Sequence, residues 1–148
     1  MDPAPTDLRR LAVALLLLLA GGMAAPTSLA AQDLERLFYY VDQETSFESF
    51  REHADRIDVV APSAYSVDGD GVLWGQVDPR VLRLAEEHDV EVMPLVLNPG
   101  FDQEMLHRLL SSDRARSRAI ESMVELCRRH GYAGIQFDFE NLHMNDRE

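Results

Sequence analysis

The sequence has one cysteine, one tryptophan and no lysine among its 148 residues. A single cysteine, Cys127, excludes an intrachain disulfide and a zinc knuckle made of Cys-x-x-Cys pairs. With 14 basic residues, all arginine, against 26 acidic ones, the formal net charge is −12. The basic stripe of a nucleic-acid-binding protein is therefore absent, and an anionic membrane surface is disfavoured as a partner. We expect no nucleic-acid partner.

One uncharged apolar run, residues 11–20, follows Arg9 and Arg10, and small residues then lead to Ser28 and Ala30. A basic start, a short apolar region and small residues at positions −3 and −1 predict a secretory signal peptide over residues 1–30. The run is shorter than the roughly 20 apolar residues of a membrane span. We expect a secreted, periplasmic or cell-envelope protein without a stable membrane span after cleavage; an uncleaved anchor is the alternative.

Strand-like and helix-like segments alternate after residue 30. Aromatic and β-branched stretches predict strands at residues 37–41, 57–61, 90–97 and 134–140. Helices are predicted between them: one opening with a Thr45-x-x-Glu48 capping box, two capped by Asp78 and Asp102, and one over residues 113–130. This order predicts an α/β fold with parallel strands, either a doubly wound sheet or a (β/α)₈ barrel.

The last predicted strand carries the polar side chains of most interest. Gln136, Asp138 and Glu140 share one face because side chains alternate along a strand. Parallel strands beneath helices are normally apolar on both faces, whereas this one presents two carboxylates about 7 Å apart. Catalytic groups lie at the C-terminal ends of the strands in parallel barrels. The alternative is a half-exposed strand with a solvated acidic face, in a small α/β domain.

A metal site is not predicted. Asp138, Glu140 and His143 are possible ligands, but the spacing of Glu140 and His143 does not place both on one strand face. No Gly-rich phosphate loop, HExxH or G-x-S-x-G motif is present either. We expect no cofactor.

Residues 133–140, Ala-Gly-Ile-Gln-Phe-Asp-Phe-Glu, resemble the D-G-x-D-x-D-x-E signature of glycoside hydrolase family 18, the chitinase-type (β/α)₈ barrels. The flanking residues 129–132 and 141–147, together with 93–98, are most similar to the bacterial spore-germination and cortex-lytic N-acetylglucosaminidases. The resemblance extends from about Phe38 to the end. It implies that residues 31–148 form the N-terminal part of the catalytic domain, the N-terminal half of a TIM barrel that is incomplete in this chain.

The resemblance also implies roles for the two carboxylates. Glu140 matches the general acid, and Asp138 matches the group that orients the 2-acetamido group of the substrate, whose carbonyl oxygen is the nucleophile. The implied activity is a retaining, substrate-assisted glycosidase that cleaves β-1,4 linkages next to N-acetylglucosamine in peptidoglycan or chitin-like glycans. Two signature positions differ: Ala133 replaces the first aspartate and Gln136 the second, and we expect Gln136 to hydrogen-bond Asp138.

Further substrate-binding residues are expected near the strand ends. Gln136, Asn98, Tyr40 and Tyr65 are the candidates, the two tyrosines as rings that stack on sugars; ordinary core or rim aromatics are the alternative for both. A non-catalytic, lectin-like relative is the alternative for the whole chain, although such relatives typically lose the acid that Glu140 retains. Because a complete barrel needs about 250 residues, we expect negligible hydrolysis by these 148 residues alone.

Overall fold

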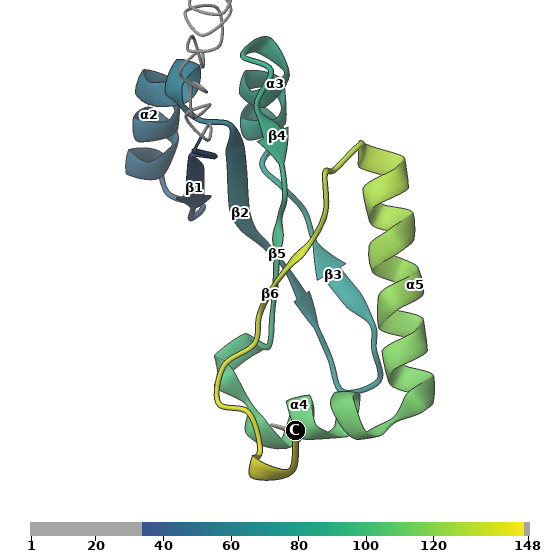
Figure 1. The fold of residues 1–148 in the computed structure, drawn as a ribbon. Helices are drawn as coiled ribbons and strands as arrows, with labels where there is room; N and C mark the ends of the chain where they lie inside the picture. The colour runs from purple at the N-terminus through teal and green to yellow at the C-terminus, as the bar shows by residue number, and fades with distance from the viewer. Residues whose placement is uncertain (1–33, 147–148) are drawn as a thin grey trace, which may run out of the picture. The chain divides into compact units, whose positions relative to one another are not determined.

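The structure, a computed structural model, describes residues 34–146, so the predicted signal peptide lies outside the described residues. Figure 1 shows their arrangement. Within residues 34–146, no helix is both long enough and apolar enough to cross a membrane.

The described residues alternate between strands and helices, as the sequence predicts. The strands are β1 (Leu37–Tyr40), β2 (Val59–Val67), β3 (Leu73–Gly75), β4 (Glu91–Val92), β5 (Leu95–Leu97) and β6 (Gln136–Asp138). The helices are α2 (Glu44–His53), α3 (Pro79–Glu87), α4 (Gln103–Ser111) and α5 (Asp113–His130), with short 3₁₀ turns η1 (Ala54–Arg56), η2 (Pro99–Phe101) and η3 (Met144–Asp146).

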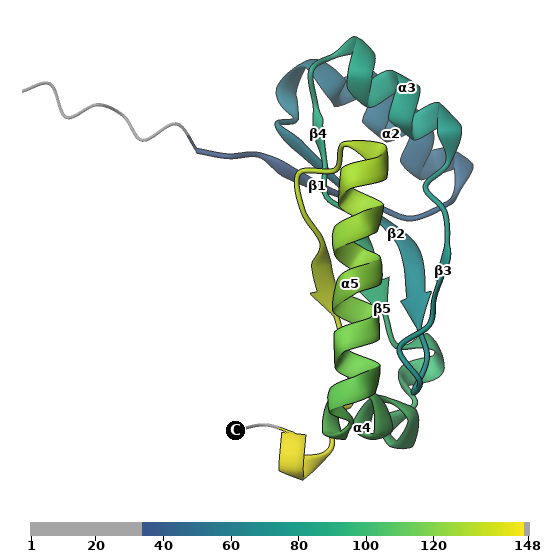
Figure 2. The same ribbon diagram turned by 90° about the vertical axis from the view of Figure 1, so that its right-hand side faces the viewer.

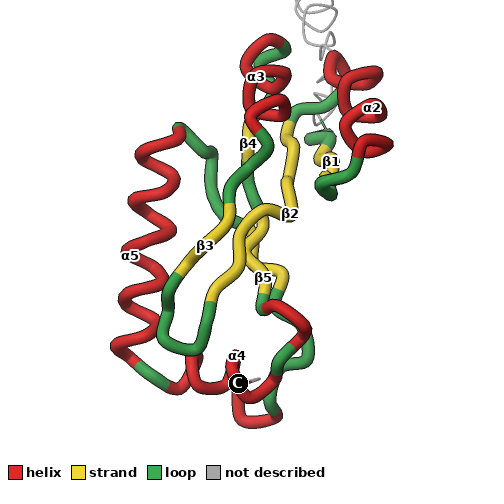
Figure 3. Tube along the Cα trace, turned by 180° about the vertical axis from the view of Figure 1, so that it is seen from behind, coloured by secondary structure: helices red, strands yellow, loops and turns green. Residues whose placement is uncertain are grey.

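The strands form one sheet in the order β1-β2-β5-β6, and all neighbouring pairs along this path are parallel. β4 also pairs with β2 in parallel, whereas β3 pairs with it antiparallel. This arrangement confirms the predicted parallel α/β class. α2 and α3 lie at one end of the sheet and α4 at the other (Figures 1 and 3).

The hydrophobic core lies between one face of the sheet and the helices. Phe38 of β1 stacks on Phe50 of α2, with ring centroids 5.9 Å apart. Val67 of β2 and Val96 of β5 belong to the same buried cluster as Met123 of α5, and Figure 2 shows α5 lying along the sheet. Burial of apolar side chains against these helices therefore fixes which sheet face points away from the core.

Local signals predict most helix ends correctly. The carboxylates of Asp78 and Asp102 accept hydrogen bonds from backbone N–H groups in the first turns of α3 and α4, at 2.8 and 3.0 Å. α5 ends at Gly131, which adopts φ +70°. The capping box at Thr45 is wrong: α2 begins one residue earlier and its N-cap, Gln43, makes no side-chain capping bond.

The third and fourth predicted strands are shorter than the sequence indicates. Met93 and Pro94 divide the third into β4 and β5, because proline has no N–H to donate to the ladder. The fourth has only three residues in the ladder, Gln136–Asp138. The sequence does not predict β3, whose three residues extend the edge of β2 beyond the end of β1.

Two glycines provide a matched test of the packing between the β2–β3 turn and α5. Gly71 and Gly131 have similar φ, +77° and +70°, but only at Gly71 would an added Cβ collide, 2.1 Å from the carbonyl oxygen of Ala115. We expect Gly131→Ala to lower the free energy of unfolding by about 1–2 kcal/mol, the cost of left-handed backbone alone. Gly71→Ala should cost clearly more in urea unfolding. Equal losses would contradict the close approach of the turn to α5.

Candidate functional site

β6 presents two chemically different faces. Gln136 and Asp138 are half-buried and lie in register with Leu95 and Leu97 of β5. Phe137 and Phe139 point the other way, with ring centroids 5.3 Å apart, and line one apolar groove beside α4 and α5. The alternation thus continues beyond the end of the strand and places Glu140 on the face of Gln136 and Asp138.

The backbone of Glu140 is held by the side chain of Asn98. The Asn98 Nδ2 donates to the Glu140 carbonyl at 2.9 Å, and its Oδ1 accepts from the Glu140 N–H at 2.8 Å. Asn98 follows β5 directly and is 1% exposed, the one buried polar residue in the described part of the chain. Its amide therefore extends the β5–β6 ladder past the last paired residues, as another peptide group would.

The two carboxylates themselves are available to a ligand. Glu140 is exposed and Asp138 half-buried, and neither side chain forms a hydrogen bond or ion pair within residues 34–146. Both lie at the C-terminal end of a parallel strand, where active-site groups of such sheets are found. This geometry allows proton transfer and hydrogen bonding to a bound molecule.

Gln136 makes a different contact from the expected one. Its Oε1 accepts a hydrogen bond from the Tyr39 hydroxyl at 3.2 Å, and its Nε2 lies 3.5 Å from the sulfur of Met93. The expected Gln136–Asp138 hydrogen bond is not formed. A flat sheet would place β1 and β6 about 14 Å apart, with two strands between them. The Tyr39–Gln136 bond therefore shows that this sheet face is concave.

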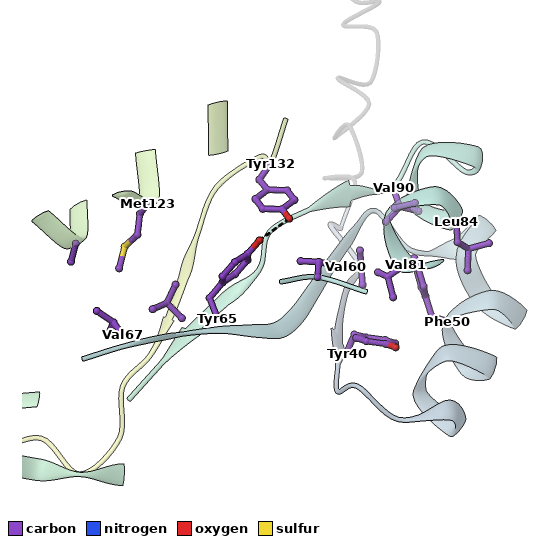
Figure 4. Close-up of a cluster of buried hydrophobic side chains, with 14 of the residues drawn as sticks. Tyr40, Phe50, Val60, Tyr65, Val67, Val81, Leu84, Val90, Met123 and Tyr132 are labelled. Carbon is purple, nitrogen blue, oxygen red and sulfur yellow. Dashed lines mark hydrogen bonds between the residues drawn. The ribbon is translucent and has the colours of Figure 1, made fainter. Parts of the chain in front are cut away.

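Tyr39 belongs to this face, although the sequence did not single it out as a candidate. It is 62% exposed, whereas Tyr40, the candidate chosen from the same strand, is 2% exposed and lies on the helix side near Phe50 (Figure 4). Burial, reinforced by Asp78 and Asp42, raises the pKa of the Tyr40 phenol. The signal available in the sequence was alternation: Phe38 and Tyr40 share a face, so Tyr39 points to the other.

Tyr65 lies apart from the carboxylates. Its ring is 4% exposed, and its hydroxyl is 3.1 Å from that of Tyr132 in the core (Figure 4). Burial, together with this hydrogen bond, raises the pKa of the Tyr132 phenol. Of the predicted site residues, the structure brings Asp138, Glu140, Gln136 and Asn98 together along β6 and the end of β5. It places Tyr40 and Tyr65 on the core side.

Comparison with known proteins shows that this chain is similar to glycosylases. No protein-family model matches the chain. The chain is 22% identical over 114 residues to the uncharacterized glycosylase YvbX of Bacillus subtilis, covering 74% of this chain and 33% of that protein. It is 26% identical over 101 residues to the cortical fragment-lytic enzyme of the same organism, covering 66% and 23%. The chain resembles glycosylases. It spans a third or less of the length of these two relatives.

A solved structure shows the architecture. A class V chitinase from Pseudomonas fluorescens Pf-5 matches 76% of this chain with a TM-score of 0.70 and 22% identity, and the match covers 37% of the chitinase. The described residues thus have the fold of one part of a (β/α)₈ barrel, with the carboxylates at the C-terminal ends of its parallel strands.

Asn98 provides a test of how Glu140 is positioned. Asn98→Ala removes both hydrogen bonds and leaves the Glu140 N–H and carbonyl to find other partners. We expect the free energy of unfolding to fall by about 2–4 kcal/mol, with faster hydrogen exchange at the Glu140 amide. Asn145→Ala is the matched control, because the Asn145 side chain is exposed; its effect should stay within about 0.5 kcal/mol. An unchanged hydrogen-exchange rate at the Glu140 amide in Asn98→Ala would contradict the positioning of Glu140 by Asn98.

Proposed function

We propose that this protein is an exported glycoside hydrolase that cleaves β-1,4 linkages next to N-acetylglucosamine. The observation that carries the proposal is the carboxylate pair, Asp138 and Glu140, on the concave face at the C-terminal end of β6, with Glu140 held through its backbone by Asn98. The likeness to proteins named as glycosylases supports the reaction class. The sequence pattern of residues 1–30 supports export.

In this proposal the two carboxylates have different roles in the reaction. Glu140 protonates the glycosidic oxygen as the bond to the leaving sugar breaks, and the resulting carboxylate then takes a proton from the attacking water. Asp138 hydrogen-bonds the 2-acetamido N–H and so directs the acetamido oxygen at the anomeric carbon. That oxygen forms the covalent bond in place of an enzyme carboxylate, and the configuration is retained after water opens the intermediate.

The other residues of the concave face position the substrate or the acid. Tyr39 and Gln136, joined by their hydrogen bond, form a polar surface next to Asp138 on the concave face, and this surface can contact a sugar ring. Asn98 acts through Glu140, since both ends of its amide are occupied by that residue's backbone. Tyr40 and Tyr65 contribute as packing residues of the core rather than as stacking platforms.

Two glycans fit this chemistry, peptidoglycan and chitin, because both present a 2-acetamido group next to a β-1,4 linkage. One relative is named a cortical fragment-lytic enzyme and a structural neighbour is a chitinase, so the comparisons support both glycans. The second candidate function is carbohydrate binding without hydrolysis. The observation that favours it is Gln136, whose amide is bonded to Tyr39 and cannot share a proton with Asp138 as an acid would.

Glu140→Gln separates hydrolysis from binding. The substitution keeps the shape and the backbone contacts to Asn98 but removes the transferable proton, so kcat/KM on N-acetylglucosamine oligosaccharides should fall by about 10²–10⁴-fold. Binding of the same oligosaccharide, measured by titration calorimetry, should persist. The assay uses the longest natural form of the protein that contains this chain, with the 148-residue chain in parallel, for which we expect negligible turnover.

Glu121→Gln is the control for this experiment, because Glu121 is an exposed carboxylate on α5, a helix that packs on the sheet face opposite to Asp138. It should leave both hydrolysis and binding unchanged. Hydrolysis that survives Glu140→Gln would remove Glu140 from catalysis. A wild-type protein that binds the oligosaccharide without cleaving it would establish the carbohydrate-binding alternative.

A further inference from the structure

A second cluster of polar side chains lies where the segment after Glu140 meets α4. His107 of α4 faces Asp146 of η3, and its Nδ1 is 2.9 and 3.0 Å from the two carboxylate oxygens. The ring of His143 lies beside that of His107, with centroids 4.5 Å apart. The sequence links His143 with Asp138 and Glu140 as possible ligands; the structure instead places it with His107 and Asp146.

The three residues are arranged as ligands for one ion. One ring nitrogen from each histidine and one oxygen of Asp146 lie within 4.8 Å of one another. The donor atoms of a tetrahedral zinc site lie about 3.4 Å apart, which follows from bonds of about 2.1 Å. Rotation of the three side chains can bring their donor atoms from within 4.8 Å of one another to the separation of about 3.4 Å that zinc requires. Another His–carboxylate pair, His88 with Asp55 at 2.6 Å, has no second histidine beside it and so lacks this arrangement.

Burial supports a cation at this place. The Asp146 side chain is 8% exposed and that of His107 is 37% exposed. A carboxylate removed from water to this extent is costly unless a positive charge is beside it. A bound cation supplies that charge, and so would a protonated His107 alone. The imidazole of His143 favours a bound cation, because an ion pair between His107 and Asp146 does not need a second histidine.

The donor set selects the class of cation. Two imidazole nitrogens and one carboxylate oxygen suit zinc and its neighbours among the first-row transition metals, whereas calcium and magnesium prefer oxygen ligands throughout. Three protein ligands would leave one tetrahedral position for water.

The geometry points to a zinc site formed by His107, His143 and Asp146, separate from the carboxylates of β6 and independent of the function proposed above. On binding, zinc accepts one nitrogen lone pair from each neutral imidazole and one oxygen lone pair from the Asp146 carboxylate, and each imidazole keeps its single proton on the ring nitrogen that does not bind zinc. His143 Nδ1 accepts the backbone N–H of Asn145 at 3.2 Å. Zinc at that nitrogen replaces this contact.

Zinc at this position would anchor the segment that follows the candidate acid, Glu140, to α4. The same segment is already joined to η2 and the start of α4. The Gln103 side-chain amide donates to the Asn141 carbonyl at 3.2 Å, and the Asn141 side-chain amide donates to the Phe101 carbonyl at 3.1 Å. A metal ion linking His107 to His143 and Asp146 adds a further connection, six residues or fewer beyond Glu140. The expected role is therefore structural, with thermal stability rising when zinc is present.

The test is zinc titration of the untagged, chelator-treated 148-residue chain by calorimetry. We expect one zinc ion per chain, and affinity at least about tenfold weaker in His107→Ala and in His143→Ala. His88→Ala is the matched control, since it removes a histidine from a His–carboxylate pair without a second imidazole. It should bind zinc as the wild type does, and so should Asp138→Asn combined with Glu140→Gln.

Several outcomes would overturn the site. These are no zinc binding, binding that survives both histidine substitutions, or binding lost when Asp138 and Glu140 are replaced. Circular dichroism checks that His107→Ala folds; His143→Ala, in a loop, is the second variant. X-ray absorption of the zinc-loaded wild type needs no variant: nitrogen and oxygen neighbours with two imidazoles support the site. Sulfur at about 2.3 Å would implicate Cys127 and contradict it.

Discussion

The site depends on one side-chain amide that joins the ends of two neighbouring strands. β5 and β6 share only three register pairs, so the ladder ends at Leu97 and Asp138. Asn98 extends it by bonding both the N–H and the carbonyl of Glu140. Because Asn98 is buried, its amide is shielded from water, and removing the two bonds would cost stability. The position of Glu140 is thus set by the sheet rather than by a free loop.

Curvature of the sheet provides the second constraint. Helices pack on one face and bury the apolar side chains there, while the hydrogen bond between Tyr39 and Gln136 shows that the other face is concave. Asp138 lies on that concave face without a protein partner among the described residues. Apolar packing on one side therefore creates the conditions for polar chemistry on the other, and both follow from the alternation of side chains along β6.

Sequence predicted those features that depend on residues close together in the chain. Asp78 and Asp102 cap their helices as expected, since a cap bonds to backbone within three residues. The sequence offers Tyr40 as a sugar-binding or core aromatic residue, and the structure buries it and exposes Tyr39 instead. A difference of one residue reverses the face, and packing against α2 decides it. The contact of Asn98 with Glu140 spans 42 residues, so only the register of β5 and β6 reveals that Asn98 holds the backbone of Glu140.

In the proposed function, the concave face at β6 binds an N-acetylglucosamine unit between Asp138 and Glu140. A crystal structure of the Glu140→Gln variant with an N-acetylglucosamine oligosaccharide is the decisive experiment. We expect the 2-acetamido N–H within hydrogen-bond distance of the Asp138 carboxylate and the glycosidic oxygen within reach of residue 140. An oligosaccharide bound elsewhere, with no contact to either side chain, would contradict it.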